Sequence, residues 1–224
     1  MHRFSLRHLT AVLLLALPLA ASASDMLLPP GSGWEGRSGP QLAAEWWQWA
    51  SAEPDETNPV QDLSGAQCAV GQRGSLWFLA GGFGSSMIQR TCTVPAGKAL
   101  FFPVINMAFW PQQGNTTYTC TQARSRAALN NDAAVDLFAE IDGVPVPEPK
   151  RFRVATEQCF NLYGRIAQAD RPYEAFPAAT DGYWLLLNPL PKGRHVLKFG
   201  GRYNRSSKAY GRMLQDIEYR LNVQ

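Results

Sequence analysis

Short apolar segments separated by turn residues make up most of the chain after Leu76. The segment Ile217-x-Tyr219-x-Leu221-x-Val223 alternates between apolar and polar side chains, the pattern of a strand with one buried face. The sequence contains 19 glycines and 16 prolines among its 224 residues, so turns are frequent and long helices are disfavoured. The same reading predicts further strands at 99–106, 135–141, 183–187 and 195–199.

Strands that follow one another without long helices pair mainly in antiparallel sheets. We therefore predict an all-β fold, a mainly antiparallel β-sandwich or jelly roll, with one tryptophan-rich N-terminal helix and one short helix. A barrel is the alternative. We expect residues 24–224 to form a single β-sandwich-like domain, because a chain of this length can bury a sizeable core.

The first helix is announced by its capping residues. Ser38 is followed by Pro40 in the first turn and by Gln41 three residues later, which predicts a helix start at this point. The helix should run to about Ala50 and bury a stripe of Leu42, Trp46, Trp49 and Ala50, with Trp47 at the edge of the stripe. The second helix is expected to begin at a Thr121 cap and to run to about Ala128.

A hairpin is expected next to the first helix. Leu76–Leu79 and Met87–Val94 read as strands, and the glycine-rich link 81–86 between them lacks the lysine of a phosphate-binding loop. The following segment Ala99–Asn106 is apolar on both faces and predicts an interior strand. Pro103 within it indicates either a bulge or an edge position.

The N-terminus has the pattern of a cleavable secretory signal. Arg3 and Arg7 precede the apolar run Leu9–Ala21, and small residues follow up to Ala23. The apolar run is shorter than the about 20 residues of a spanning helix, so we expect no membrane insertion after cleavage. Residues 1–23 are thus predicted to be a signal peptide, and the mature chain from Ser24 to be secreted or periplasmic.

Four cysteines lie in the predicted mature chain. Export sends them to an oxidising compartment, where two disulfides are expected. Three pairings are possible, and we favour the local one, Cys68 with Cys92 and Cys120 with Cys159. A zinc site is disfavoured because there is no C-x-x-C pair and the mature chain has a single histidine, His195. We expect neither a metal nor a cofactor.

Several catalytic and binding classes are disfavoured by the residues. Lys150, Arg151 and Arg153 form the longest basic cluster, too short for a nucleic-acid surface, and the two arginines are expected on the solvent face of a strand. The sequence has no G-x-S-x-G elbow, and oxidised cysteines cannot serve as nucleophiles, so no catalytic residue is assigned and His195 is expected to be structural.

One enzyme class is kept as the alternative function. A secreted paired-carboxylate hydrolase such as a glycosidase needs two acids about 5–10 Å apart in a cleft, which no sequence motif reveals. The acids nearest to aromatic residues in the sequence are Glu45, Asp62 and Asp181.

Motifs spread over most of the mature chain resemble a group of uncharacterised secreted proteins, mostly bacterial. They are Trp47-x-Trp49, Asp62-x-Ser64-Gly65-x-x-Cys68, Arg90-x-Cys92-x-Val94-Pro95-x-Gly97-Lys98, Asp181-Gly182-Tyr183-Trp184 and Pro189-Leu190-Pro191-x-Gly193-x-His195. The resemblance implies an exported single-domain protein. No activity is established for that group, so no catalytic residue is transferred from it.

The remaining signal for function lies in the tryptophans. Of the seven in the chain, Trp46, Trp49, Trp77 and Trp184 fall at positions expected to be internal. Trp34, Trp47 and Trp110 are left as candidate ligand-binding residues, with packing at the ends of the sandwich as the competing interpretation. We predict a non-catalytic binding or interaction module that uses these aromatic residues to bind an unknown glycan or protein ligand.

Overall fold

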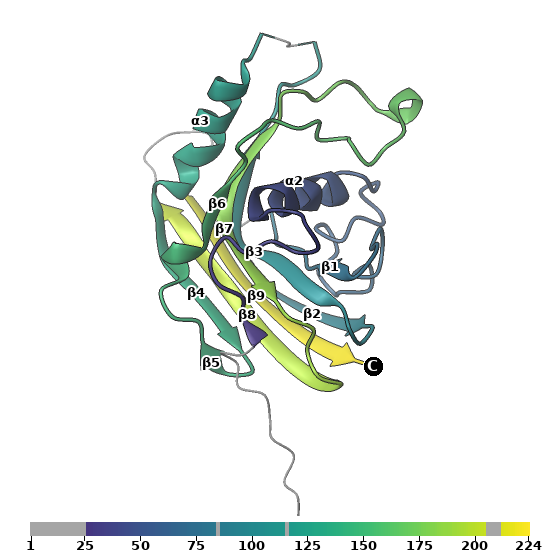
Figure 1. Ribbon diagram of the computed structural model, residues 1–224, viewed down its shortest axis with the longest axis vertical. Helices are drawn as coiled ribbons and strands as arrows, with labels where there is room; N and C mark the ends of the chain where they lie inside the picture. The colour runs from purple at the N-terminus through teal and green to yellow at the C-terminus, as the bar shows by residue number, and fades with distance from the viewer. Residues whose placement is uncertain (1–25, 84–85, 115–116, 205–211) are drawn as a thin grey trace, which may run out of the picture.

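In the part of the chain that the structure describes, two β-sheets pack face to face, with two α-helices on the outside (Figure 1). The computed structural model describes residues 26–83, 86–114, 117–204 and 212–224, so the predicted signal peptide 1–23 lies outside the described residues. The first sheet has the order β1 (Leu76–Phe78), β3 (Ala99–Phe109), β7 (Ala179–Leu187), β6 (Arg153–Ala155). The second has the order β2 (Ser86–Val94), β9 (Arg212–Val223), β8 (Gly193–Asn204), β4 (Ala134–Ile141), β5 (Val144–Pro145).

The predicted β-rich sandwich with few helices is confirmed, and so are the strands expected from alternation. In β9 the residues Ile217, Tyr219, Leu221 and Val223 are all buried against the first sheet, as their spacing predicts. The interior strand is β3, which pairs with β1 and β7, and its register shifts between Pro103 and Ile105. The proline therefore marks a bulge in a central strand.

The predicted hairpin of 76–79 and 87–94 is wrong. β1 pairs in parallel with β3, and β2 pairs in parallel with β9. The link between β1 and β2 therefore crosses from one sheet to the other. Burial explains the choice of partner: all of β1 is buried, as is most of β3, whereas β2 and β9 each bury only alternate residues. Each sheet therefore contains one parallel pair within a mainly antiparallel arrangement.

The helix α2 (Gly39–Ala50) begins as predicted. Ser38 and Gln41 form a capping box, and the proline lies in the first turn. The helix packs on the outer face of the first sheet, where Trp46 and Trp49 join a second cluster of buried side chains with Phe101 and Trp184 (Figure 1). The rings of Phe101 and Trp184 are stacked, with centroids 5.1 Å apart.

The helix α3 (Cys120–Asn131) is present, but its predicted Thr121 cap is wrong. Thr119 is the cap, because its hydroxyl accepts from the backbone of Gln122 and the Gln122 side chain accepts from the Thr119 N–H. The helix also extends beyond Ala128, since its C-terminal Asn131 is buried and donates to the carbonyl of Asp181 in β7.

Both predicted disulfides are confirmed, with Cα atoms 6.0 Å apart for Cys68–Cys92 and 5.7 Å apart for Cys120–Cys159. The first ties the loop after α2 to β2, and the second ties the start of α3 to the segment after β6. They therefore attach the long connections to the sandwich.

The prediction that two arginines lie on the solvent face of a strand is wrong for Arg151 and confirmed for Arg153, an exposed residue of β6. Arg151 lies in the short 3₁₀ helix η1 (Pro149–Phe152), where it is exposed and pairs with Glu148. Arg153 lies in β6 and forms ion pairs with Asp181 and Asp132. A second 3₁₀ helix, η2 (Gln168–Asp170), lies in the long connection to β7.

Candidate functional site

Two of the three candidate tryptophans meet at one end of the sandwich. Trp47 comes from α2 and Trp110 from the residue after β3, and their ring centroids lie 6.2 Å apart with the planes inclined by 49°. The helix places Trp47 there because its neighbours are anchored: Trp46 Nε1 donates to the carbonyl of Leu79 and Trp49 Nε1 to that of Val70. Trp47 is left half-buried at the edge of the stripe, as predicted.

The two rings line a pocket with a volume of about 220 Å³, which we call the tryptophan pocket. Its walls come from α2, the loop after it, the link between β1 and β2, the end of β3, and the start of β9. The lining residues are Trp46, Trp47, Ala50, Ser51, Val60, Gly82, Phe83, Asn106, Met107, Ala108, Trp110 and Met213. None carries a formal charge, and most are apolar.

One wall of the pocket is held by a buried arginine. Arg90 in β2 is 1% exposed, and its guanidinium donates to four backbone carbonyls instead of to a carboxylate. Two of these carbonyls belong to Val60 and Asp62 in the loop after α2, and two to Ala80 and Gly81 after β1. The guanidinium thus joins two segments that both contribute to the pocket.

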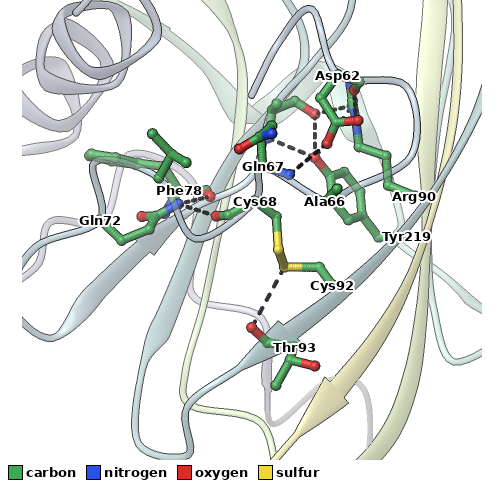
Figure 2. The surroundings of a disulfide bond; sticks show 12 residues. Asp62, Ala66, Gln67, Cys68, Gln72, Phe78, Arg90, Cys92, Thr93 and Tyr219 are labelled. Carbon is green, nitrogen blue, oxygen red and sulfur yellow. Dashed lines mark hydrogen bonds between the residues drawn. A yellow bond between two sulfur atoms is a disulfide. The ribbon is translucent and has the colours of Figure 1, made fainter. Parts of the chain in front are cut away.

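Figure 2 shows Arg90 with Asp62 and Tyr219 beside the Cys68–Cys92 disulfide. The Tyr219 hydroxyl donates to the Ala80 carbonyl and accepts from the Ala80 N–H. Burial raises the pKa of Tyr219, against the opposing effect of the Arg90 charge, so the hydroxyl keeps its proton at neutral pH.

A second polar side chain positions the glycine of the same wall. The Gln215 side chain is buried in β9, accepts from the Gly82 N–H and donates to the Val104 carbonyl. A Cβ on Gly82 would lie 2.6 Å from Ile88 Cδ1, so a larger residue here would displace the end of the Ile88 side chain in β2.

The part of the wall that comes from α2 and β3 contains two buried hydrogen-bond donors without partners. Trp47 Nε1 and Asn106 Nδ2 have no hydrogen-bond partner among the described residues, and both nitrogens are covered by neighbouring atoms. An unpaired buried donor costs about 1–3 kcal/mol. Because these nitrogens are covered, the wall presents less polarity to a ligand than its residue types suggest.

Trp110 is anchored on the outside of the pocket. Its Nε1 donates to the Tyr173 hydroxyl, and its ring packs on the small cluster of Leu162, Ala175 and Ala178. Trp110 therefore contributes both to the pocket and to this cluster.

The third candidate, Trp34, lies apart from the pocket. It is half-buried against the cluster under α2, and its Nε1 donates to the Ser75 hydroxyl. The structure therefore brings together Trp47 and Trp110 and does not bring Trp34 to them.

The three acids considered for a hydrolase have separate partners. Glu45 pairs with Arg37 on the flank of α2, and Asp62 accepts from the backbone of Gln67 and from Ser64 in its own loop. Asp181 is buried in β7, and both its carboxylate oxygens accept from Arg153. None of the three lines the tryptophan pocket.

The environments of these acids explain their pKa shifts. Burial would raise the pKa of Asp62, but the hydrogen bonds from Gln67, Ser64 and Gly65 outweigh it and lower the pKa below 3.8. Burial raises the pKa of Asp181 in spite of the opposing Arg153 charge. Neither shift comes from a second carboxylate held close by, as a sharing pair would require; the charge of Asp132 is the smallest contribution at Asp181.

His195 has structural partners at the start of β8. One ring nitrogen lies 2.7 Å from Asp142 Oδ2 and the other 2.9 Å from the Pro191 carbonyl oxygen, so both positions are occupied. Among the described residues there is no group of three or more His, Cys, Asp or Glu side chains arranged to hold a metal ion. No helix in the described part of the chain is both long and apolar enough to cross a membrane.

Of the twelve residues that line the pocket, sequence reasoning assigned only Trp47 and Trp110 to a ligand site. Phe83, Met107 and Met213 line it but belong to three segments that carry no shared motif. Asn106 did carry a signal, because it is a polar residue within an otherwise apolar interior strand. Its position on the pocket wall depends on where β3 ends relative to α2.

No protein-family model and no curated protein matches the chain. A chain from the structure of PbICP-C in complex with falcipain-2 is similar at 11% identity and a TM-score of 0.27, over 67% of this chain and 100% of that one. The solution structure of amebosin is similar at 10% identity and a TM-score of 0.18, over 62% of this chain and 98% of that one. Both TM-scores are too low to indicate a common fold.

Proposed function

We propose that this protein is an exported, disulfide-stabilised, non-catalytic binding module whose ligand site is the tryptophan pocket. The observation that carries the proposal is the meeting of Trp47 and Trp110, from elements far apart in the sequence, on the wall of an uncharged pocket of about 220 Å³. Binding sites are typically concave and mostly apolar, with few polar groups, and this pocket has that character.

Export is supported by two independent features. The N-terminal sequence has the order of a secretory signal, and all four cysteines are paired in disulfides, which persist in oxidising compartments. Secretion places the pocket in the periplasm or outside the cell, where a glycan or a protein would be its ligand.

The proposal is tested by single alanine variants of Trp47 and Trp110, with Trp34→Ala as the matched control. Ligands are first sought with the mature wild-type protein on a glycan array and in a pull-down from secreted proteins. We expect Trp47→Ala and Trp110→Ala to lose binding at least about tenfold, whereas Trp34→Ala keeps it, since only the first two rings line the pocket.

The competing role of these rings is packing alone. In that case both variants would lose about 3–5 kcal/mol of unfolding free energy and would still bind the ligand. Thermal unfolding of all three variants separates the two roles, and a pair of destabilised variants with wild-type affinity would refute the proposed site.

A further inference from the structure

The tryptophan pocket has features that select among ligand classes, and the inference from them rests on the proposed function. The first feature is charge. No acidic or basic side chain lines the pocket, so a charged group inside it would lose its hydration without gaining an oppositely charged partner. The part of the ligand that enters is therefore neutral.

The second feature is size. An apolar cavity of about 150 Å³ holds one benzene molecule. The tryptophan pocket, at about 220 Å³, is large enough for a single ring or a fused pair of rings and too small for a chain of several sugar units. Only one group of the ligand can be enclosed.

The third feature is the arrangement of the two indoles. A ring inserted between two parallel rings needs about 7 Å between them, because stacked carbon atoms lie about 3.5 Å apart. Trp47 and Trp110 have centroids 6.2 Å apart and are inclined by 49°, so they form one angled wall. Such a wall favours an aromatic group that meets one ring face to face and the other edge to face.

The fourth feature is the composition of the remaining wall. Met107 and Met213 supply polarisable sulfur atoms, which make favourable contacts with aromatic rings, and Phe83 adds a ring that is 65% exposed. Sugar hydroxyls need several exposed donors and acceptors. Here Ser51 and Asn106 are the only lining residues with a hydroxyl or amide side chain, and the Asn106 Nδ2 is covered.

We propose that the tryptophan pocket binds one neutral aromatic group of the ligand, about the size of a phenyl or indole ring, and that it does not bind a sugar ring. The same chemistry is found in a free aromatic molecule and in the side chain of a protein ligand. The two sources are separated by the probes below.

The test measures binding to the full mature protein by ligand-observed NMR and calorimetry. Benzyl alcohol and benzoate are a matched pair that differ in charge, and cyclohexylmethanol is the non-aromatic match of benzyl alcohol. We expect benzyl alcohol and indole to bind with dissociation constants on the order of 1 mM. Benzoate should bind at least about tenfold more weakly because of its desolvation, and cyclohexylmethanol should also bind more weakly.

Variants place the binding in the pocket. Phe83→Ala should weaken benzyl alcohol binding several-fold, and Met213→Leu tests the sulfur while it keeps the volume. Leu214→Ala is the control, because Leu214 follows Met213 in β9, is 48% exposed and does not line the pocket. N-acetyl-tryptophanamide distinguishes the two sources of the aromatic group. If it binds at least about tenfold more tightly than indole, a protein side chain is favoured, and if it binds as tightly as indole, a free aromatic molecule is favoured.

Two outcomes would overturn the inference. If maltotriose or cellotriose binds in a way that depends on Trp47 while benzyl alcohol and indole do not bind, the pocket is a sugar site and the proposed function still stands. Both proposals are wrong if two results occur together. Neither aromatic probe binds at a concentration about tenfold above the expected dissociation constant, and the ligand screen finds no ligand whose binding is lost in Trp47→Ala.

Discussion

Replacing Arg90 with methionine should destabilise the protein strongly, although the substitution removes a buried charge. Buried ion pairs are often exchanged for apolar residues without loss, because the guanidinium and its carboxylate leave together. Arg90 forms no ion pair with a carboxylate in the part of the chain that the structure describes. Its N–H groups donate to the carbonyls of Asp62 at 2.7 Å, Gly81 at 2.9 Å, Ala80 at 3.0 Å and Val60 at 3.2 Å.

The loss of stability comes from the backbone carbonyls that lose their donor when the guanidinium is removed. Ala80 keeps the Tyr219 hydroxyl as a donor, but the carbonyls of Val60, Asp62 and Gly81 lose theirs. A buried carbonyl without a donor costs about 1–3 kcal/mol, and the relief of guanidinium desolvation offsets part of the sum. We expect a net loss of about 3–5 kcal/mol, which for a chain of this size lowers Tm by roughly 6–20 °C.

Urea unfolding followed by tryptophan fluorescence under non-reducing conditions measures the loss. Arg220→Met is the matched control, because Arg220 lies in β9, is 62% exposed and forms only a surface ion pair with Glu218. Its substitution should cost less than about 1 kcal/mol. If Arg90→Met falls within about 1 kcal/mol of the wild type, the carbonyls find other donors and Arg90 does not hold the wall of the tryptophan pocket.

Two further predictions concern the loop between α2 and β1. The lowered pKa of Asp62 means that the unfolded chain binds more protons near pH 3.8, so its contribution to stability is present above that pH and is lost as the pH falls. In urea unfolding, Asp62→Asn should therefore lose less free energy of unfolding than the wild type as the pH falls below about 4. A difference between variant and wild type that does not change with pH would contradict this. Gly65→Ala should cost more than Gly74→Ala: both glycines have positive φ, but only at Gly65 would a Cβ meet the backbone of β2, at 2.3 Å. Equal urea midpoints for the two variants would show that the close approach carries no cost.

Local signals in the sequence predicted the elements well. Ser38 and Gln41 form the capping box that their spacing indicates, because the capping bonds involve residues only three apart. Alternation in β9 identified its buried face, since the pleat alone decides it. The disulfide pairs followed from proximity in the chain, although the hairpin that suggested the first pair does not exist.

Partners far apart in the sequence were not predicted. β1 pairs with β3 and β2 with β9 because their patterns of burial match, and no local motif expresses that match. The alternation of side chains along β2 did contain one usable signal. Ile88, Arg90 and Cys92 share one face, so a strand with a buried Ile88 has to bury the arginine as well.

The tryptophan pocket shows why a binding site of this kind escapes a reading of the sequence. Large rings approach each other there without filling the space, since Ala50, Gly82 and Ala108 contribute little side-chain volume to its walls. The glycine also leaves room for the end of the Ile88 side chain, so its small size serves a contact outside the pocket as well. The pocket therefore exists partly because small residues lie at positions in three separate elements. Such positions share no periodicity, charge pattern or spacing, so a reading of the sequence cannot recognise them before the elements are placed.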